Sequence, residues 1–578
     1  MSAELDIIVR GGTILDGTGA AAYTADLGIS GGKIAEIGKI SRRAHEELDA
    51  QGCIITPGFV DIHTHYDGQA TWENCLQPSS GHGVTSVVMG NCGVGFAPCR
   101  SGDRQLLIQL LEGVEDIPEV VMTEGLPWTW ETFPDYLNVL ASRTLDVDFA
   151  AQLPHSALRV YVMGERGANH EPANAADLAA MRRLTTESIK AGAIGVSTSR
   201  SLAHRSKAGD LAPSVGTVEQ ELLAIAQGLG DSGTGVFQLI YDGHSGAEHE
   251  FSLMRRIAET SGRPLSFSLM DHPNWPGSWR TMLSGLEKAV ADGLEMRAQI
   301  FPRPVGVLMG LQLSLHPFSF HPGYKAIASM PLAERVARMR DPAMRAQLLA
   351  EQPECPNPIT LRLIQRVNEM FVLGDPPDYE PDSAEYIGAQ AAARGVAAME
   401  LIYDALLTDE GEAILCLPAA NMTADTPYST SAMIRHPNTV FGLGDGGAHY
   451  GLICDASFPT HTLIRWVRDA SGAERQDLSQ VIHKLTGGPA QAVGLFDRGS
   501  LKPGMKADVN LIDLSRLKLH APRAKHDLPA GALRIRQQAE GYIATITSGQ
   551  ITYRNGEHTG ALPGRLVRGS QPSPEAHL

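Results

Sequence analysis

Short apolar runs recur through the middle of the chain, and most are followed by a stretch with the three-and-four residue spacing of an amphipathic helix. Eight such runs lie at 59–64, 85–89, 149–153, 194–197, 236–240, 265–270, 296–301 and 440–443. Strands that alternate with helices indicate right-handed crossovers and a parallel sheet. Eight of them predict an α/β fold built on a closed (β/α)8 TIM-like barrel.

The two ends of the chain have a different pattern, in which short apolar runs are separated by glycines, as is typical of small strands and tight turns. We therefore expect one small β-sandwich domain from residues 1–56 and 497–578, beside a barrel over residues 57–496. Two barrel connections are unusually long, near 102–144 and 311–399. Such insertions are commonly lids or substrate walls, and simple thickening of the scaffold is the equal alternative.

Composition excludes several classes of protein. The chain has 578 residues, 43% of them hydrophobic, so it can fill a large core, and its net charge of −17 argues against a nucleic-acid partner. Its seven cysteines form an odd number without a regular framework, which favours free thiols in a reducing compartment. There is no apolar leader and no apolar run near 18 residues, so we expect a cytoplasmic protein without membrane insertion.

Candidate chemistry begins where the first run ends. Side chains two apart in an extended strand point to the same side, so His63 and His65 present two imidazoles about 7 Å apart along the backbone. This is a metal-ligand spacing, at the end of the strand where barrel enzymes keep their chemistry. We expect Asp61 or Asp67 to hold the second nitrogen of one ring. The alternative is a pair of polar residues at a strand edge.

Two further runs end in residues that suit the same site. Cys92 follows the second run, and a thiolate beside two imidazoles is a credible zinc ligand, although a lone cysteine is more often a small buried hydrophobe. Asp445 follows the eighth run among four glycines, where it can bind a metal, accept a proton from water, or do both. A turn-forming aspartate is the alternative.

At this point the sequence resembles a known family. The segments 8–17 (IVRGGTILDG), 57–65 (PGFVDIHTH) and 501–508 (LKPGMKAD) resemble the amidohydrolase superfamily. The segments 60–69, 90–93 (GNCG), 195–198 (GVST), 444–446 (GDG) and 559–565 (TGALPGR) are similar to its N-acyl-D-amino-acid deacylase (D-aminoacylase) branch. The resemblance spans nearly the whole chain.

The resemblance implies a metal-dependent (β/α)8 barrel with a small β-sandwich domain that hydrolyses an amide. By motif, His63 and His65 are metal ligands, and Cys92 takes the place where other members use a bridging carboxylate. Asp445 is implied to be a ligand and the general base, which later returns its proton to the leaving amine.

Two positions depart from the branch. Its members end the fifth and sixth strands with a metal-binding histidine, where this chain has Gln238 and then Leu269 or Met270. His244 and His272 lie further into the loops and are candidate substitutes, although an ordinary loop histidine is the more common case. We therefore expect one zinc ion rather than two. Gln238 and His449 join His244 and His272 as further candidates for binding a metal or the substrate.

Other candidates lie near the expected mouth. His155 and His449 are placed to donate to a developing oxyanion, and orienting a neighbour is the equal alternative. The branch also has a lysine for the substrate carboxylate that is missing here. A bidentate arginine can do that work, and the candidates just beyond strand ends are Arg200, Arg205, Arg297 and Arg303.

The expected function is therefore hydrolysis of a linear N-acyl amide, first of all an N-acyl-D-amino acid, by water that a metal activates and Asp445 deprotonates. One alternative is a hydrolase of neutral fatty or aromatic N-acyl amides, which the missing lysine favours. An alternative of another class is a metal-free, non-catalytic scaffold of the same fold. The expected partner is a small N-acyl substrate, and a homo-oligomer is left open.

Overall fold

The computed structural model describes residues 4–422 and 428–574. Its central sheet has eight parallel strands in the order β16-β12-β11-β10-β9-β8-β7-β6. Their bounds are β6 (Phe59–Asp61), β7 (Val84–Met89), β8 (Asp148–Pro154), β9 (Gly195–Ser199), β10 (Val236–Ile240), β11 (Leu265–Leu269), β12 (Met296–Ile300) and β16 (Thr439–Phe441). Each predicted run overlaps one of these strands, which confirms the predicted barrel.

The first and eighth strands are joined beyond their carboxyl ends. The backbone N–H of His65 donates to the carbonyl oxygen of Gly446 at 2.7 Å, and the N–H of Asp445 donates to that of His63 at 3.1 Å. The two loops thus close the mouth of the barrel. This closure brings Asp445 beside both histidines.

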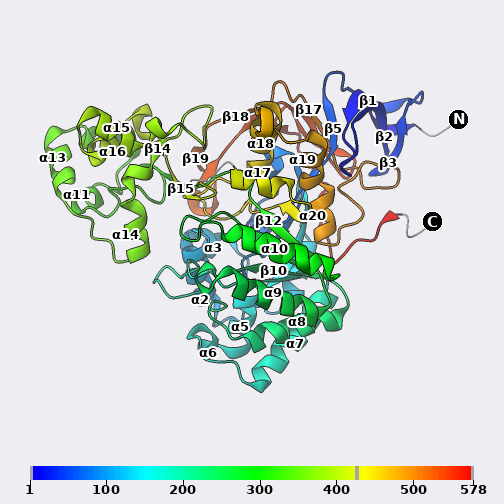
Figure 1. Ribbon diagram of the computed structural model, residues 1–578, viewed down its shortest axis with the longest axis horizontal. Coiled ribbons are helices and arrows are strands. Elements are labelled where there is room, and N and C mark those ends of the chain that lie inside the picture. The colour runs from blue at the N-terminus through cyan, green and yellow to red at the C-terminus, as the bar shows by residue number, and fades with distance from the viewer. Residues whose placement is uncertain (1–3, 423–427, 575–578) are drawn as a thin grey trace.

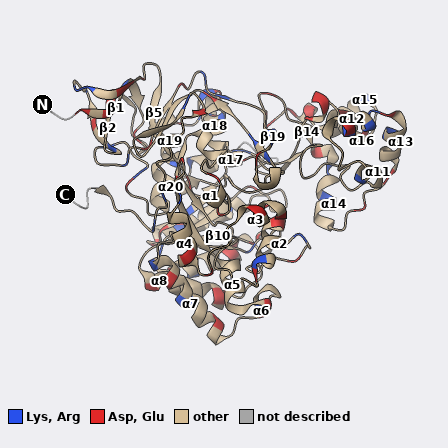
Figure 2. Cartoon of the chain, turned by 180° about the vertical axis from the view of Figure 1, so that it is seen from behind, with Lys and Arg blue, Asp and Glu red and all other residues tan. Residues whose placement is uncertain are grey.

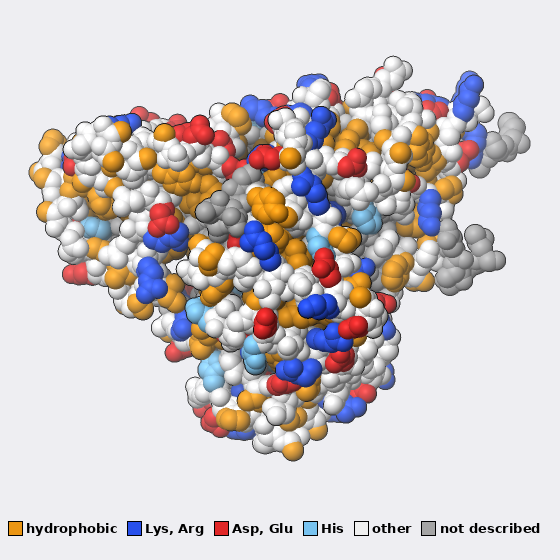
Figure 3. All heavy atoms as spheres, viewed as in Figure 1, with side chains coloured by type: hydrophobic (Ala, Val, Ile, Leu, Met, Phe, Trp, Pro, Cys, Tyr) orange, Lys and Arg blue, Asp and Glu red, His pale blue; other side chains and the backbone are white. Residues whose placement is uncertain are grey.

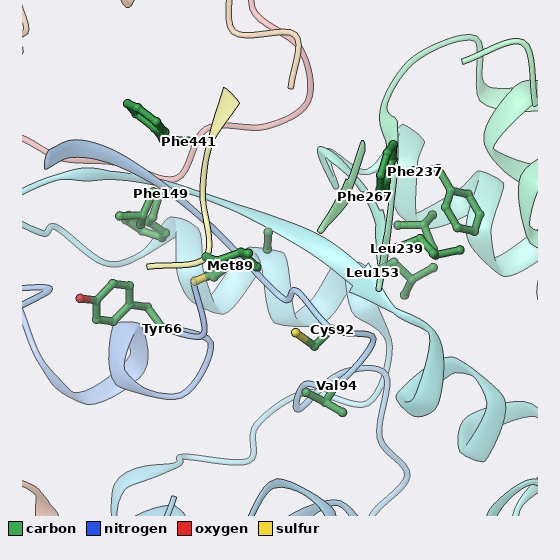
Figure 4. Close-up of a cluster of buried hydrophobic side chains, with 14 of the residues drawn as sticks. Tyr66, Met89, Cys92, Val94, Phe149, Leu153, Phe237, Leu239, Phe267 and Phe441 are labelled. Carbon is green, nitrogen blue, oxygen red and sulfur yellow. The ribbon is translucent and has the colours of Figure 1, made fainter. Parts of the chain in front are cut away.

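Helices cover the outside of the barrel strands (Figure 1). Those that follow β8 to β11 are α5 (His155–Met163), α6 (Glu165–Ala168), α7 (Ala175–Lys190), α8 (Glu219–Ser232), α9 (Ala247–Ser261) and α10 (Ser278–Ala291). The side chain of Asn174 caps α7 by accepting from the backbone N–H groups of Ala176 and Asp177. Between strands and helices lies the main apolar core, which includes Phe237 and Phe267 (Figure 4).

Both ends of the chain contribute to one nine-stranded sheet. It holds β1 (Leu5–Ile14), β2 (Tyr23–Ser30), β3 (Lys33–Gly38), β4 (Ala44–Asp49), β5 (Ile54–Pro57), β17 (Val509–Ile512), β22 (Tyr542–Thr547), β23 (Gln550–Arg554) and β24 (Glu557–His558). Antiparallel pairing of β5 with β17 joins the two segments. A separate sheet domain from both ends is therefore confirmed, and the residue boundaries given above remain a prediction.

The first long connection is built into the core. It contains α2 (Arg104–Val114), α3 (Glu119–Gly125) and α4 (Phe133–Ala141), whose apolar residues join the main cluster. Trp130 is buried, its indole N–H donates to the carbonyl oxygen of Phe96, and its ring lies 5.0 Å from that of Tyr136. Trp130 of this connection therefore contributes packing.

The second long connection forms a lobe at one side of the molecule (Figure 1). The lobe has its own apolar core and contains α11 (Pro322–Lys325), α12 (Leu332–Met339), α13 (Pro342–Ala350), α14 (Pro358–Ile364), α15 (Ile387–Arg394) and α16 (Ala398–Leu406). A small sheet of β13 (Val305–Met309), β15 (Leu415–Ala420) and β14 (Phe371–Val372) adjoins it. The elements of this lobe and sheet run from Val305 to Ala420, between β12 and β16.

The remaining elements connect these parts. They are α1 (Gln69–Trp72), α17 (Tyr428–Arg435), α18 (Phe458–Thr462), α19 (Leu478–Leu485), α20 (Gly487–Ala492), β18 (Lys518–Leu519), β19 (Arg523–His526), β20 (Leu533–Arg536) and β21 (Ala539–Glu540). Positive and negative side chains are interspersed along the chain and over the face seen in Figure 3 (Figures 2 and 3). Among the helices of residues 4–422 and 428–574, none is long and apolar enough to cross a membrane.

Candidate active site

Two histidines and a cysteine meet at the mouth of the barrel. Nε2 of His63 lies 3.3 Å from Sγ of Cys92, and Nε2 of His65 lies 3.6 Å from the same sulfur. One ligand atom from each residue lies within 4.8 Å of the other two, and all three side chains are buried. Figure 4 shows Cys92 in the turn that follows Met89, the last residue of β7. The structure thus brings together three of the predicted metal ligands.

Asp445 completes this group from the loop after β16. Its Oδ1 lies 3.5 Å from Nε2 of His63 and 3.6 Å from Nε2 of His65. The backbone of Asp445 has φ +47, a left-handed conformation that costs about 1 kcal/mol outside glycine. At Gly447, with φ +91, a Cβ would lie 2.7 Å from the carbonyl carbon of His65. Glycine at position 447 therefore allows the backbone of this loop to pack directly against the backbone of His65.

The four side chains offer the donors that a zinc ion prefers, namely two imidazole nitrogens, a sulfur and a carboxylate oxygen. Oδ1 of Asp445 is buried, and no group in the described chain hydrogen-bonds to it. Burial raises the pKa of Asp445, but His65, His63 and His449 outweigh it and hold that pKa well below its usual value. Burial also raises the pKa of the Cys92 thiol to about 12. A bound cation would supply the charge that ionises this thiol, so the residues fit a metal ion.

Each imidazole is oriented through its other nitrogen. Nδ1 of His63 lies 2.8 Å from Oε1 of Gln299 on β12, and Nδ1 of His65 lies 3.3 Å from Oε1 of Glu115. Both Nε2 atoms therefore face the shared centre, in the manner that fixes the tautomer of a metal ligand. Glu115 is 1% exposed and follows α2, so the first long connection supplies a residue of the site.

The expectation that Asp61 or Asp67 would hold a ring nitrogen is wrong. Oδ1 of Asp61 accepts from the backbone N–H of His63 at 3.2 Å, and Oδ2 of Asp67 accepts from the backbone N–H of Gly90 at 2.9 Å. Aspartates so near in sequence reach the backbone more easily than the ring. They therefore hold the loops of the mouth in place.

Two further histidines surround the centre. His449 was predicted, and its Nε2 lies 3.6 Å from Oε2 of Glu115. His204, in the loop after β9, was missed, and its Nδ1 is buried without a hydrogen-bond partner in the described chain. Burial lowers the pKa of His449 to about 4 and that of His204 to about 3, with His65 contributing in both cases. Both rings are therefore neutral near pH 7.

Comparison with known proteins identifies the family. The sequence matches the profile of the Amidohydrolase family over residues 46–553. This chain belongs to that family. It is 37% identical to a D-aminoacylase of Alcaligenes xylosoxydans xylosoxydans over 200 residues, which cover 34% of this chain and only 38% of that protein.

Other relatives match the amidohydrolase chain over nearly its whole length. It is 27% identical to an N-acyl-D-glutamate deacylase of Alcaligenes xylosoxydans xylosoxydans, over 92% of this chain and 91% of that protein. A crystal structure of N-acyl-D-glutamate deacylase from Bordetella bronchiseptica, in complex with zinc and a phosphonate inhibitor, superposes with a TM-score of 0.64. That match has 23% identity and covers 98% of this chain and 100% of the other, so it supports the fold.

His155 of the amidohydrolase lies in a closed buried network. Its Nδ1 is 2.8 Å from Oγ1 of Thr198, and its Nε2 is 2.7 Å from Oε1 of Glu221, which also pairs with Arg159. Both ring nitrogens are therefore used within the protein. These contacts support a structural role for His155. They give no support to a catalytic role, which stays a prediction.

The structure does not bring His244 or His272 into the metal-binding group. The side chain of His244 is 58% exposed and pairs with Asp242, while the ring of His272 stacks on Trp275 at 4.2 Å. Gln238 lies in β10 and is fully buried. Neither of the two loop histidines therefore replaces a strand ligand in this arrangement.

The four candidate arginines have partners inside the protein. Arg200 forms an ion pair with the buried carboxylate of Glu250, and Arg205 donates to two backbone carbonyls. Arg297 is the second residue of β12 and so lies at the opposite end of the barrel from the mouth. Arg303 is buried and pairs with Asp455. These contacts do not single out an arginine for a substrate carboxylate.

Proposed function

We propose that this amidohydrolase is a metal-dependent hydrolase of linear N-acyl amides, with N-acyl-D-amino acids as the first substrate class. The observation that carries the proposal is the buried Oδ1 of Asp445, which has no hydrogen bond from the described chain and lies within 3.6 Å of Nε2 of both His63 and His65. The thiol of Cys92 lies beside the same two histidines. An acid-base group and a complete set of metal donors therefore share one point at the barrel mouth.

A zinc ion held by His63, His65 and Asp445, with Cys92 beside it, would supply Lewis acidity that polarises a carbonyl and activates water. Asp445 then accepts the proton of the attacking water and passes it to the leaving nitrogen. The new C–O bond replaces the C–N bond, and the products are a carboxylic acid and an amine. His449 is neutral and donates an N–H to the oxygen on which negative charge develops.

We propose a single ion. The fifth strand carries Gln238 and the sixth ends at Leu269, so neither has a histidine directed at a second ion. The tight grouping at the mouth consists of His63, His65 and Cys92. Free thiols at all seven cysteines, which all lie in the described ranges, support a cytoplasmic location as part of the same proposal.

The substrate class rests on the relatives. The 27% identity to an N-acyl-D-glutamate deacylase extends over 92% of the chain, which supports an acylated D-amino acid. The second candidate is a neutral fatty or aromatic N-acyl amide. It is favoured by the missing lysine of the branch and by the pairing of Arg200 with a buried glutamate. The intact donor set at the mouth opposes the metal-free scaffold.

Release of free amine from matched substrates tests the proposal. Zinc-loaded enzyme is given N-acetyl-D-amino acids, their L-enantiomers and N-acyl alkylamines. We expect hydrolysis of the D series, and a loss of at least about 10³-fold in kcat for Asp445→Asn with zinc content and Tm retained. Asp404→Asn, on the exposed surface of α16, is the matched control. Full activity of Asp445→Asn, or turnover of alkylamides alone, would overturn the assignment.

A further inference from the structure

Gln238 is a buried polar residue that the mechanism above does not use. Its side chain is 0% exposed in the middle of β10, and neither Nε2 nor Oε1 has a hydrogen-bond partner in the described chain. A buried polar group left unpaired costs about 1 to 3 kcal/mol. Most buried side-chain amides in proteins have hydrogen-bond partners. We therefore expect this amide to bind a ligand that offers one hydrogen-bond acceptor and one donor.

The register of the sheet shows which way Gln238 points. It pairs with Ser197 on β9 and with Ser266 on β11, and registered neighbours in a sheet share a face. The adjacent Phe237 and Leu239 lie on the other face, in the apolar core (Figure 4). Gln238 therefore faces the same interior as the two serine hydroxyls.

Both hydroxyls lie next to the metal-binding group. Oγ of Ser197 accepts from the backbone N–H of Gly93, the residue after Cys92, at 3.0 Å. Oγ of Ser266 accepts from Nε2 of Gln299, and Oε1 of the same amide contacts Nδ1 of His63. Gln238 is thus flanked on both sides by hydroxyls, one bonded to the residue after Cys92 and the other linked through Gln299 to His63.

Gln299 is a buried glutamine of the same barrel whose side-chain amide does have hydrogen-bond partners. It is buried on β12, and both atoms of its amide are hydrogen-bonded. Other buried side-chain atoms without a hydrogen-bond partner in the described chain include Oγ of Ser268 on β11 and Oδ1 of Asp445. Oδ1 of Asp445 is a buried atom like the two amide atoms of Gln238, but the whole side chain of Asp445 is 22% exposed and that of Gln238 is 0% exposed, so Gln238 lies deeper than the proposed catalytic group.

We propose that Gln238 binds the amino-acid half of the substrate, with Oε1 accepting the N–H of the scissile amide and Nε2 donating to the adjacent carboxyl oxygen. An extended acylamino acid offers this donor and acceptor on one edge. The N–H and C=O of a single trans amide point in opposite directions and cannot serve both atoms. The inference rests on the proposed function and selects acylated amino acids over acylated alkylamines.

A neutral amide has a further consequence for specificity. The Nε2 group donates equally well to a carboxylate and to a carboxamide oxygen, whereas a lysine or arginine favours the charged group. Gln238 therefore recognises the N–H and carbonyl edge of an amino-acid unit, and the enzyme accepts N-acyl amino acid amides as well as the free acids.

The test compares wild type with Gln238→Leu on three substrates with the same acyl group: an N-acyl-D-amino acid, its carboxamide and an N-acyl alkylamine. We expect kcat/KM to fall by about 10² for the first two and by less than about threefold for the third. Zinc content should be unchanged, and Tm should stay equal or rise, because an unpaired buried amide has been removed. Gln227→Leu, on the exposed face of α8, is the control.

Each other outcome overturns the inference. An equal fall on all three substrates would assign Gln238 to general orientation of the site. An unchanged kcat/KM with a lower Tm would make it a structural residue satisfied by water, and loss of zinc would make it a metal ligand. Should Gln238→Leu not fold, Gln238→Met keeps the length without the amide. If wild type cleaves none of the three, the proposed function fails as well; if it cleaves them and the variant matches it, only this inference fails.

Discussion

The amino ends of the barrel strands carry a buried charge cluster whose strength can be measured. Asp148, the first residue of β8, pairs through Oδ2 with Arg498 at 2.7 Å and with Lys506 at 3.0 Å, and its Oδ1 accepts from the backbone N–H of Arg565. All three partners come from the C-terminal segment. Asp148 thus fastens that segment to the barrel, at the end opposite the proposed site.

The structure gives the size and sign of the effect. Burial raises the pKa of Asp148, but Lys506 and Arg498 outweigh it and lower that pKa from 3.8 to about 2. A folded-state pKa below the unfolded value stabilises the protein above about pH 4, and this stability is lost as the pH falls toward 2. The shift corresponds to about 2 kcal/mol near pH 7, and about half of that remains at pH 3.

Urea unfolding of wild type and Asp148→Asn from pH 8 to pH 3 measures directly how much Asp148 contributes to the free energy of unfolding. We expect the variant to be less stable by about 2 kcal/mol between pH 8 and 5, with the difference narrowing by about half at pH 3. The exposed Asp382→Asn serves as the control. Activity per folded, zinc-loaded chain should not change, because stability and chemistry lie at opposite ends of a barrel. A difference that is absent, or that stays constant down to pH 3, would refute this reasoning.

Three further changes test the site. Glu115→Leu removes the partner of His65 and should weaken zinc affinity about 10- to 100-fold in a chelator competition, whereas unchanged affinity would show that Glu115 does not support the ligand. His155→Ala leaves Glu221 buried without one partner and should lower Tm while zinc per chain stays constant; loss of zinc at an unchanged Tm would contradict the structural role. Gly447→Ala places a Cβ 2.7 Å from the carbonyl carbon of His65 at φ +91, so kcat/KM should fall at least about tenfold, and a wild-type value would show that the loop relaxes freely.

The barrel could be predicted because its strands are buried on both faces and therefore read as apolar runs. The same topology explains why His63, His65, Cys92 and Asp445 could be expected to lie together. Parallel strands deliver whatever follows their carboxyl ends to one mouth, so residues distant in sequence can be grouped before any contact is seen.

The partners of the ligands were harder to predict. Glu115 follows α2 in a long connection, and its path to His65 depends on how that connection packs, which no periodicity encodes. Gln299 did leave a signal, since it is a polar residue inside an apolar strand. His155 shows how little a position after a strand says about partners: its place after β8 suggested the mouth, and in the structure its two ring nitrogens contact Thr198 from β9 and Glu221 from α8.

Metal content is the most direct test of the central claim, that one ion is held by the side chains following the first and eighth strands. Elemental analysis of the purified protein should give one zinc per chain in wild type and none in His63→Ala, with both proteins folded. Two ions per chain in wild type, or an ion retained in His63→Ala, would contradict the account.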